Sequence, residues 1–390
     1  MAEFDLTKLY EKYEGFTHPA SRVLLGGKNP ADDKKANLGV TNFTVELTSD
    51  FKASIATFYI TGGFDETNGV YDMDVLKKYI GLGNDVTIQM GHAASITEVF
   101  KGYIARVDFV YLPYEELLGA VRITAMDVKG IMMANNSSKR LKANYYSDAV
   151  SEIFEGESYK NLIQRSVITD LAVTDTPDKP PAPPGGAPAP PPTETPDNRI
   201  EMVAESDYDF VVRAAKKFNY EFFSIGGNIA FRPAKSNTKE LIDIIPSVVI
   251  QSFDIGYDIT GLVGEVKVRT IDVAKAQKIE VKKKNAGKFS LSGKAKPLVS
   301  KQAYVYTDSA VETQTDADLR ATYIMEDMSY RFGSLSMTLS GMPEMVPGRF
   351  ITLTGFGEGV SNKYYLTDVI HEHTEAGFFT TIVGKASTLS

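Results

Sequence analysis

Apolar residues recur with helical spacing in residues 206–233, the most strongly patterned stretch of the chain. Ser206 suits a helix N-cap, and Asp207 and Asp209 place acidic groups where the helix dipole favours them. The apolar positions that follow lie on one face of a helix: Phe210, Val211, Ala214, Ala215 and Phe218. The pattern predicts a helix that ends at Asn219.

Two short runs with strand character follow this helix. Tyr220–Ile225 and Ile229–Phe231 flank Gly226-Gly227-Asn228, which has the residue types of a hairpin turn, and Pro233 comes directly after. Residues 206–233 are therefore predicted to form a compact helix–hairpin unit, with β-rich regions on both sides of it.

Alternation of apolar and polar residues dominates residues 38–130. Short strands are predicted here, separated by glycines and charged turns: Phe43–Leu47, Ser54–Ile60, Val86–Ile88, Val99–Val107 and Val121–Ala125. Val75–Tyr79 fits a short helical turn. Many short strands with few helices are typical of a barrel or sandwich. We assign 1–37 to an N-terminal arm and 38–130 to a first β-barrel domain.

The pattern becomes mixed in residues 131–250, which we assign to an α/β middle domain. Ser147–Phe154 fits a helix with Ala149, Val150, Ile153 and Phe154 facing inward, whereas Leu162–Leu171 fits neither state. Ten of the chain's 18 prolines lie in residues 177–196. Such a segment has nothing to bury, so we expect an exposed loop that acts as a spacer; a ligand for a proline-recognising domain is the alternative.

Strand patterns return in residues 251–390, assigned to a second β-barrel domain. Gly264–Arg269 alternates well, and Asp316–Tyr330 fits a helix with Leu319, Tyr323, Ile324 and Met328 on one face. Further strands are predicted at Leu335–Leu339, Phe350–Leu353, Tyr364–Ile370 and Phe378–Val383. The basic segment 275–301 is expected to be a solvated hairpin or loop, with contact to an acidic partner as the alternative.

The two β-rich regions contain similar local patterns. Gly83–Ile88 parallels Gly348–Leu353, with a Gly-x-x-apolar-Thr-apolar pattern in both. Tyr103 precedes Val107 by four residues, as Tyr365 precedes Val369. The repetition predicts one domain type used twice. The expected fold class is thus α+β and β-rich, with two similar tube-like β-barrel domains and a smaller α/β middle domain.

Composition narrows the function classes. With 390 residues, two to four domains are expected. A formal net charge of -8 argues against a dedicated nucleic-acid binder, and the absence of Cys excludes disulfides and thiolate chemistry. No run approaches the roughly 18 apolar residues that a membrane span needs, and the N-terminus lacks an apolar signal sequence. We therefore expect synthesis in the cytoplasm without stable membrane insertion.

Candidate chemistry is sparse. His371 and His373 would point to one side of a strand, with Glu375 beyond, but no third metal ligand has suitable spacing, so we expect the pair on a solvated strand face. Gly355–Gly359 resembles part of a nucleotide-binding loop, yet it lies between strands, where no helix N-terminus could hold phosphate; a turn is expected. We predict no catalytic residues, no metal site and no cofactor.

Three pieces of the chain together carry a family resemblance. The first is Leu82–Ile88 with Val99–Ile104, and the second is Ser206–Ala215 leading into Tyr220–Phe223. The third comprises Gly341–Pro343, Pro347-Gly348, Tyr364–His371 and Gly377–Thr381. Extending in this order over most of residues 38–385, the pieces resemble the late control D family, the baseplate hub proteins of contractile phage tails, and the hub portion of type VI secretion spike proteins.

The resemblance implies a non-enzymatic, homotrimeric hub in an assembled tail or injection particle. In such a hub, two barrels per subunit form a ring of six that matches the hexameric inner tube protein, and the threefold side carries a spike. Because the sequence stops soon after the second barrel, the resemblance implies a separate spike protein, alongside other baseplate proteins as partners. It assigns no task to residues 177–196.

Two other function classes remain open on the sequence. A monomeric carbohydrate- or peptide-binding β-rich module fits a chain with 21 Phe and 20 Tyr. A tail-associated cell-wall hydrolase would need an additional catalytic segment, and none of that size is visible. The sequence does not distinguish a phage from a bacteriocin or another injection system.

Overall fold

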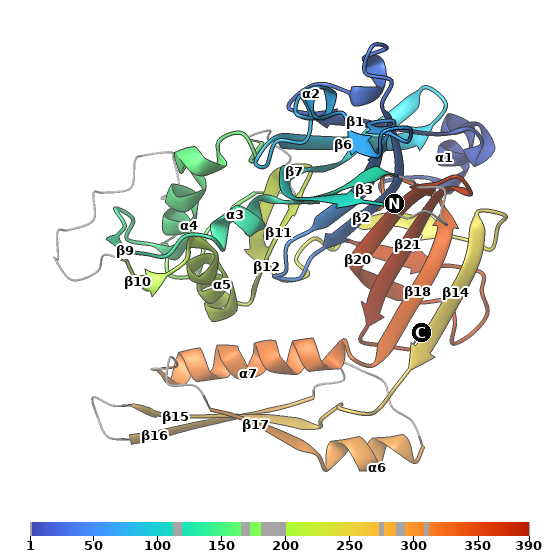
Figure 1. Ribbon diagram of the computed structural model, residues 1–390. Coiled ribbons are helices and arrows are strands. Elements are labelled where there is room, and N and C mark those ends of the chain that lie inside the picture. Colours follow the sequence, from blue (N-terminus) through green and yellow to red (C-terminus); the bar gives the residue numbers. More distant parts are fainter. Residues whose placement is uncertain are drawn as a thin grey trace, which may run out of the picture.

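The computed structural model describes residues 2–111, 119–164, 172–180, 200–272, 277–285, 293–307, 311 and 313–389. Its largest feature is a twelve-stranded sheet that contains strands from both β-rich regions (Figure 1). Helices are few and short by comparison. The predicted α+β, β-rich fold class is confirmed.

The large sheet consists of two half-sheets that contain strands from the two ends of the chain. The N-terminal half-sheet contains β1 (Pro19–Leu25), β2 (Gly39–Thr48), β3 (Ile55–Thr61), β6 (Asp85–His92), β7 (Ser95–Val110) and β8 (Ala120–Met126). The C-terminal half-sheet contains β13 (Glu240–Ile244), β14 (Ile250–Tyr257), β18 (Gly333–Ser340), β19 (Phe350–Leu353), β20 (Lys363–Thr374) and β21 (Gly377–Ala386).

The two half-sheets have the same strand order. In space they read β1-β6-β7-β8-β3-β2 and β13-β19-β20-β21-β18-β14. Numbered by chain order within each half-sheet, both orders are first, fourth, fifth, sixth, third and second. They differ at the first strand, since β1 is antiparallel to β6 whereas β13 is parallel to β19.

The similarity of the half-sheets extends to the pairing of individual residues. Tyr103 lies opposite Asp85, which follows Gly83 by two residues. In the same way Tyr365 lies opposite Phe350, which follows Gly348 by two residues. An extra residue then interrupts the next ladder at the same distance from each tyrosine, at Ala105 in β7 and at Thr367 in β20. The two sequence patterns noted above therefore form equivalent strand pairs.

The helix–hairpin unit of residues 206–233 forms as predicted. It contains α5 (Asp207–Phe218), β11 (Tyr220–Ile225) and β12 (Asn228–Pro233). A capping box between Ser206 and Asp209 begins α5, and Asn219 ends it in a left-handed conformation. Around it lie α3 (Val128–Met132), α4 (Tyr146–Phe154), a 3₁₀ turn (Glu157–Tyr159), β9 (Ser137–Arg140) and β10 (Glu201–Glu205).

The middle region has its own hydrophobic core, which includes Val150 and Ile153 of α4 and Phe210 of α5. It is shorter than the 131–250 assigned from sequence, because β13 already belongs to the large sheet. Residues 165–171 of the ambiguous Leu162–Leu171 stretch, and residues 181–196 of the proline-rich stretch, lie outside the described residues.

A separate unit interrupts the C-terminal half-sheet between β14 and β18, and the sequence did not predict it. This inserted unit contains β15 (Glu265–Asp272), β16 (Gln277–Lys284), α6 (Ala295–Ser300), β17 (Ala303–Thr307) and α7 (Gln314–Ser329). The helix α7 covers one face of the three-stranded sheet (Figure 1), and both contribute to a core of their own. The region 251–390 is therefore not one uninterrupted barrel.

Two expectations inside the inserted unit are corrected. Where it is described, the basic segment includes β16, which pairs antiparallel with β15 as in the predicted hairpin, but the segment is not fully solvated, since Ile279 and Val281 are buried in the unit's core. The helix α7 buries Ala317, Ala321, Met325 and Met328, whereas Leu319 is 39% exposed. Small alanines let the helix approach the sheet closely, so the buried face is rotated from the one that large side chains suggested.

The segment assigned to an N-terminal arm packs against the large sheet. Its helix α1 (Leu6–Lys12) buries Leu9, the side chain of Tyr13 is fully buried, and β1 pairs with β6. The remaining short elements are 3₁₀ turns (Glu14–Phe16 and Pro30–Asp32), β4 (Phe64–Asp65), β5 (Val70–Tyr71) and α2 (Met73–Leu76). The helix α2 overlaps the helical turn predicted at Val75–Tyr79 only at Val75 and Leu76.

Candidate functional site: the seam of the sheet and its free edges

Strands β2 and β20 form the seam that joins the two half-sheets. Their antiparallel register runs from Phe43 opposite His373 to Thr48 opposite Asp368. On one face of this seam Phe43, Val45 and Val369 are fully buried. The seam therefore combines a backbone hydrogen-bond ladder with a dry apolar face, so that the two half-sheets form a continuous structure.

His371 lies in the buried face of the seam, which corrects the expectation of a solvated strand face. Its ring contacts the hydroxyl of Thr380 at 3.0 Å and the carbonyl of Met345 at 3.2 Å. Burial lowers the pKa of His371 to about 4, because the charged imidazolium is poorly solvated there. The side chain is a neutral, hydrogen-bonded core residue.

The described part of the chain contains no group of three or more His, Asp or Glu residues that could hold a metal ion. His373 is half-buried and contacts the Ser21 hydroxyl at 3.4 Å. The Gly355–Gly359 stretch forms the connection between β19 and β20, with positive φ at Gly355, Gly357 and Gly359. It is a turn, as predicted, and has no helix N-terminus for phosphate binding.

A buried ionic network connects the helix–hairpin unit to the C-terminal half-sheet. Arg232 of β12 and Glu221 of β11 form an ion pair of 2.6 Å, and the Tyr365 hydroxyl of β20 donates to the same carboxylate. Arg232 also donates to the carbonyl of Gly348 at 2.7 Å. Burial and the adjacent Glu221 carboxylate raise the pKa of Tyr365 well above its ordinary value.

Gly348 is required at its position for two reasons. Its φ of 77° is one that other residues rarely adopt, and a Cβ added there would lie 2.4 Å from the Phe223 ring of β11. The hairpin therefore packs directly against the backbone of the turn before β19. The sequence pattern around Gly348 reflects this contact as well as strand pairing.

The equivalent tyrosine of the N-terminal half-sheet also contacts the middle region. Tyr103 belongs to the core of that region, and its hydroxyl lies so close to Gly130 of α3 that a Cβ there would be 2.5 Å away. The middle region, which includes the helix–hairpin unit, thus contacts the two half-sheets at equivalent strands, β7 and β20. This arrangement lets the middle region hold both half-sheets in place.

A second buried ionic pair lies where α3 leaves the N-terminal half-sheet. Lys129 is fully buried, 3.8 Å from Asp127, and its ammonium donates to the carbonyls of Asp50 and Lys52 in the connection between β2 and β3. Burial raises the pKa of Asp127 and lowers that of Lys129. Because every polar group of Lys129 serves a backbone or carboxylate partner, we interpret the pair as structural.

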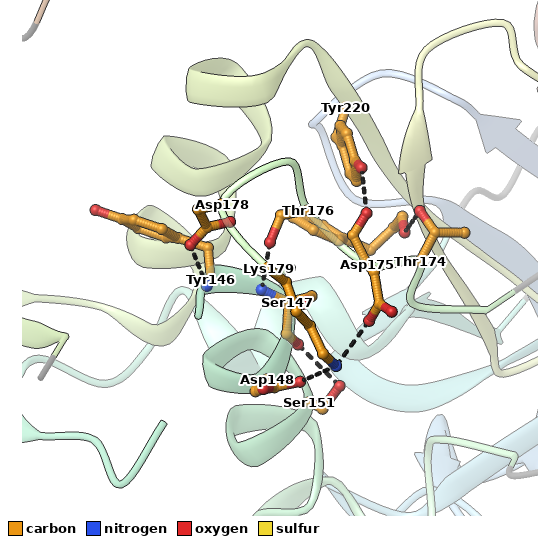
Figure 2. Close-up of polar contacts among 11 residues, drawn as sticks. Tyr146, Ser147, Asp148, Ser151, Thr174, Asp175, Thr176, Asp178, Lys179 and Tyr220 are labelled. Carbon is orange, nitrogen blue, oxygen red and sulfur yellow. Dashed lines mark hydrogen bonds and ion pairs between the residues drawn. The ribbon is translucent and has the colours of Figure 1, made fainter. Parts of the chain in front are cut away.

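The beginning of the proline-rich stretch is anchored to α4 (Figure 2). The Lys179 ammonium lies 2.7 Å from Asp148 and 2.8 Å from Asp175, and the Asp178 carboxylate accepts from the backbone N–H of Tyr146. The backbone N–H of Ser147 donates to the Thr176 hydroxyl. Residues 177–180 are therefore fixed in place, which corrects the expectation that the whole 177–196 stretch is an unattached spacer.

Besides the outer edge of β1, two edges of the large sheet have no strand partner in the described structure. Strand β14 is the last strand at one end and pairs only with β18. Strand β7 pairs with β6 from Ser95 to Tyr103, so its last residues have no partner on that side. Both edges carry exposed aromatic side chains, namely Phe253, Phe109 and Tyr111. Exposed apolar strand edges favour pairing with another chain.

In the part of the chain that the structure describes, no helix is long and apolar enough to cross a membrane.

The fold is similar to those of solved tail proteins. The tail protein from Neisseria meningitidis MC58 has 11% sequence identity and a TM-score of 0.63, over 94% of this chain and 96% of that one. The 43 kDa tail protein of prophage MuSo2 from Shewanella oneidensis has 12% identity and a TM-score of 0.64, over 93% and 97%. At this identity the likeness establishes the fold, and it extends over nearly the whole of each chain.

A component of the type VI secretion system of E. coli shows a more distant likeness, with 10% identity and a TM-score of 0.49 over 90% of this chain and 74% of that one. No curated protein matches the sequence. A family model described as the Alg8 N-terminal domain matches residues 192–375, less than half of the chain. That span ends between β20 and β21, so it divides a strand pair and does not correspond to a complete unit of this fold.

Proposed function

We propose that the chain is a structural hub subunit of a contractile tail or contractile injection system. In this proposal it forms a homotrimer that joins the hexameric inner tube to a separate spike protein within the baseplate. The observation that carries the proposal is the repeated strand order of the two half-sheets, in a fold shared with tail proteins over more than nine-tenths of the chain.

The duplication matters because of symmetry. A trimer meets a sixfold tube without mismatch only if each subunit offers two similar surfaces. The half-sheets repeat their strand order, the register at Tyr103 and Tyr365, and the position of the bulge that follows each tyrosine. The edges of β14 and of the end of β7, which have no strand partner there among the described residues, give one chain a means of pairing with the next. Together these features support a ring of three chains with six similar half-sheets.

A non-enzymatic role is part of the same proposal. The buried ionic groups of the described residues, Glu221 with Arg232 and Asp127 with Lys129, have structural partners and lie away from solvent. The inserted unit and the middle region each have a hydrophobic core of their own, as structural units do. A hub acts by holding its partners in register, which requires rigidity and complementary surfaces instead of reactive groups.

Light scattering on the purified chain tests the proposal. A mass of three chains is expected, and electron microscopy of the same sample should show a ring with six similar lobes. A monomer at micromolar concentration would contradict the hub and favour a β-rich binding module. Detection of the chain in purified tail or injection particles from the source cells would establish its place in the assembly.

A further inference from the structure

The common register of the half-sheets assigns each residue of β2 an equivalent in β14. Met126 lies opposite Tyr103, and Lys385 lies opposite Tyr365, so these two residues correspond. Their neighbours on β3 and β18 are Ile55 and Ser334.

The next step along the ladders reaches the last strand of each half-sheet, β2 and β14. Glu46 of β2 pairs with Ile55, and Gly256 of β14 pairs with Ser334. Glu46 and Gly256 are therefore equivalent, which makes residues 43–48 of β2 correspond to residues 253–258. Tyr365 and Tyr103 are equivalent, so the residues that follow each of them by three to eight positions are equivalent too. These are residues 368–373 of β20 and residues 106–111 at the end of β7.

By these equivalences, the two free edges correspond to the two strands that pair in the internal seam. Within the chain, 43–48 pairs with 368–373. The equivalent stretches are 253–258, at the outer edge of β14, and 106–111, where β7 extends past β6. Neither stretch has a strand partner on that side in the described structure. Each chain thus has one seam formed and the two parts of another unformed.

The free edges have the surface that an unformed seam requires. Phe43 is 1% exposed in the internal seam, whereas its equivalent Phe253 is 48% exposed. His371 is fully buried, whereas its equivalent Phe109 is 47% exposed, and the nearby Tyr111 is 57% exposed. At these two positions, side chains that are buried in the internal seam are therefore matched by exposed aromatic rings at the free edges.

We propose that residues 253–258 of one chain add as an antiparallel strand to residues 106–111 of a second copy, in the register of the internal seam. This inference rests on the proposed hub function, since it takes another copy of this chain as the partner. The register places the following residues opposite one another: Phe253 and Tyr111, Asp254 and Val110, Ile255 and Phe109, Gly256 and Asp108, Tyr257 and Val107, and Asp258 and Arg106.

The side chains agree with this register on both faces of the strand pair. One face carries three apolar or aromatic pairs, matching the buried face of the internal seam. On the other face Asp258 lies opposite Arg106, so that opposite charges meet. Gly256 faces Asp108 and leaves room for the ion pair of 2.8 Å that Asp108 makes with Arg106. A shift by one residue would place Phe253 on the charged face.

The absence of cysteine in the natural sequence allows a disulfide test on the full chain. The variant with Asp254→Cys and Val110→Cys places thiols at directly opposed positions in the proposed register. Directly opposed residues have Cβ atoms about 4.5–5.5 Å apart, close enough for a disulfide after a small adjustment. Mild oxidation of the purified oligomer should give products of two and three covalently linked chains on a gel without reductant.

Two matched variants control the experiment. Thr44→Cys with Glu372→Cys occupies the equivalent positions of the internal seam and should form a disulfide within one chain. Asp254→Cys with Tyr111→Cys is shifted by one residue, which puts the thiols on opposite faces, and should give at least tenfold less linked product.

Light scattering on each variant separates the two proposals. A trimer that forms no link with the first variant, while the internal pair oxidises, would overturn the register and leave the hub function standing. A trimer in which the shifted pair links as efficiently would also overturn the register. A wild-type chain that stays monomeric would contradict both the second seam and the hub.

Discussion

At the scale of single residues, equivalent positions of the two half-sheets serve different contacts. Tyr103 contributes to the core of the middle region, whereas Tyr365 donates to the buried Glu221 carboxylate. Gly83 has open space around it, whereas Gly348 lies directly under Phe223. The repeated sequence pattern therefore maintains strand pairing in both half-sheets, and each half-sheet contacts the middle region through different interactions.

Tyr365→Phe should destabilise the chain by about 1–3 kcal/mol, because the buried Glu221 carboxylate loses one of its donors. Glu221 keeps Arg232, so the fold should persist. Denaturant unfolding measures the loss. Tyr304→Phe is the control, since Tyr304 is 40% exposed and its loss of a hydroxyl should change stability by less than about 0.5 kcal/mol. Equal effects of the two substitutions would contradict the role of the network.

His371 should make the folded chain less stable as the pH falls from about 6.5 toward 4. Its folded pKa of about 4 is below the ordinary value of 6.5, so in this window the unfolded chain binds a proton that the folded chain does not. The full effect is about 3 kcal/mol, of which about 2 kcal/mol falls between pH 7 and pH 5. His371→Gln, which cannot titrate, should lose less stability than the natural chain across that interval. Parallel stability curves for the two proteins would count against this cause.

At the scale of elements, strands and amphipathic helices with clear caps could be predicted, and their tertiary surroundings could not. Ser206 and Asp209 identify the start of α5 through local hydrogen bonds, which depend only on neighbouring residues. The buried face of α7 and the burial of His371 depend on partners distant in sequence. Alternation alone cannot distinguish a strand with one solvated face from one covered by an additional layer.

The inserted unit shows the same limit in a different way. Gly264–Arg269 was predicted as a strand, and it is one, but it pairs within the inserted unit instead of the large sheet. Strand propensity does not specify a partner, because pairing depends on register and on distant residues. The internal repeat of the sequence was more informative, since the two patterns around Tyr103 and Tyr365 form equivalent pairs.

Replacement of residues 181–196 by a short Gly/Ser linker should leave the melting temperature nearly unchanged, because the prolines, alanines and glycines there offer little apolar surface to a core. A matched replacement of 177–196 should lower it by a few degrees. That variant also removes Asp178 and Lys179, and with them the contacts to α4. Calorimetry on both variants makes the comparison. A similar loss in both would show that the proline-rich residues themselves contribute to packing.

At the scale of the whole molecule, the fold joins two similar half-sheets through one seam. Among the described residues, the matching edges of β14 and of the end of β7 have no strand partner. A sheet that ended there in the isolated chain would expose backbone groups and aromatic side chains that favour uncontrolled association. Closure into a ring would cover both edges with equivalent surfaces. The middle region contacts both half-sheets from one chain, which would fix the angle between neighbouring half-sheets and hence the number that closes a ring.

The purified chain should show no hydrolysis of peptidoglycan above background. The motivating observation is that the ionic groups at the centre of the described structure are buried and paired, without a group of acidic and histidine residues that could hold a metal. A dye-release assay on purified cell walls, with a known hydrolase as positive control, measures the activity. Hydrolysis that is lost on substitution of a single carboxylate would overturn the non-enzymatic role.

Assembly should depend on Phe253 far more than the stability of the single chain does. Phe253→Lys would place an ammonium opposite Tyr111 at each of three identical seams, where burial of the aromatic ring otherwise contributes about 1 kcal/mol per seam. Three seams then weaken the trimer by about 3 kcal/mol, on the order of a hundredfold in the association constant. Val248→Lys is the matched control, because Val248 is 80% exposed just before β14 and lies outside the proposed strand pair. Light scattering over a dilution series should show dissociation of the first variant at concentrations where the second remains trimeric. Identical dilution curves would mean that this edge does not join the chains.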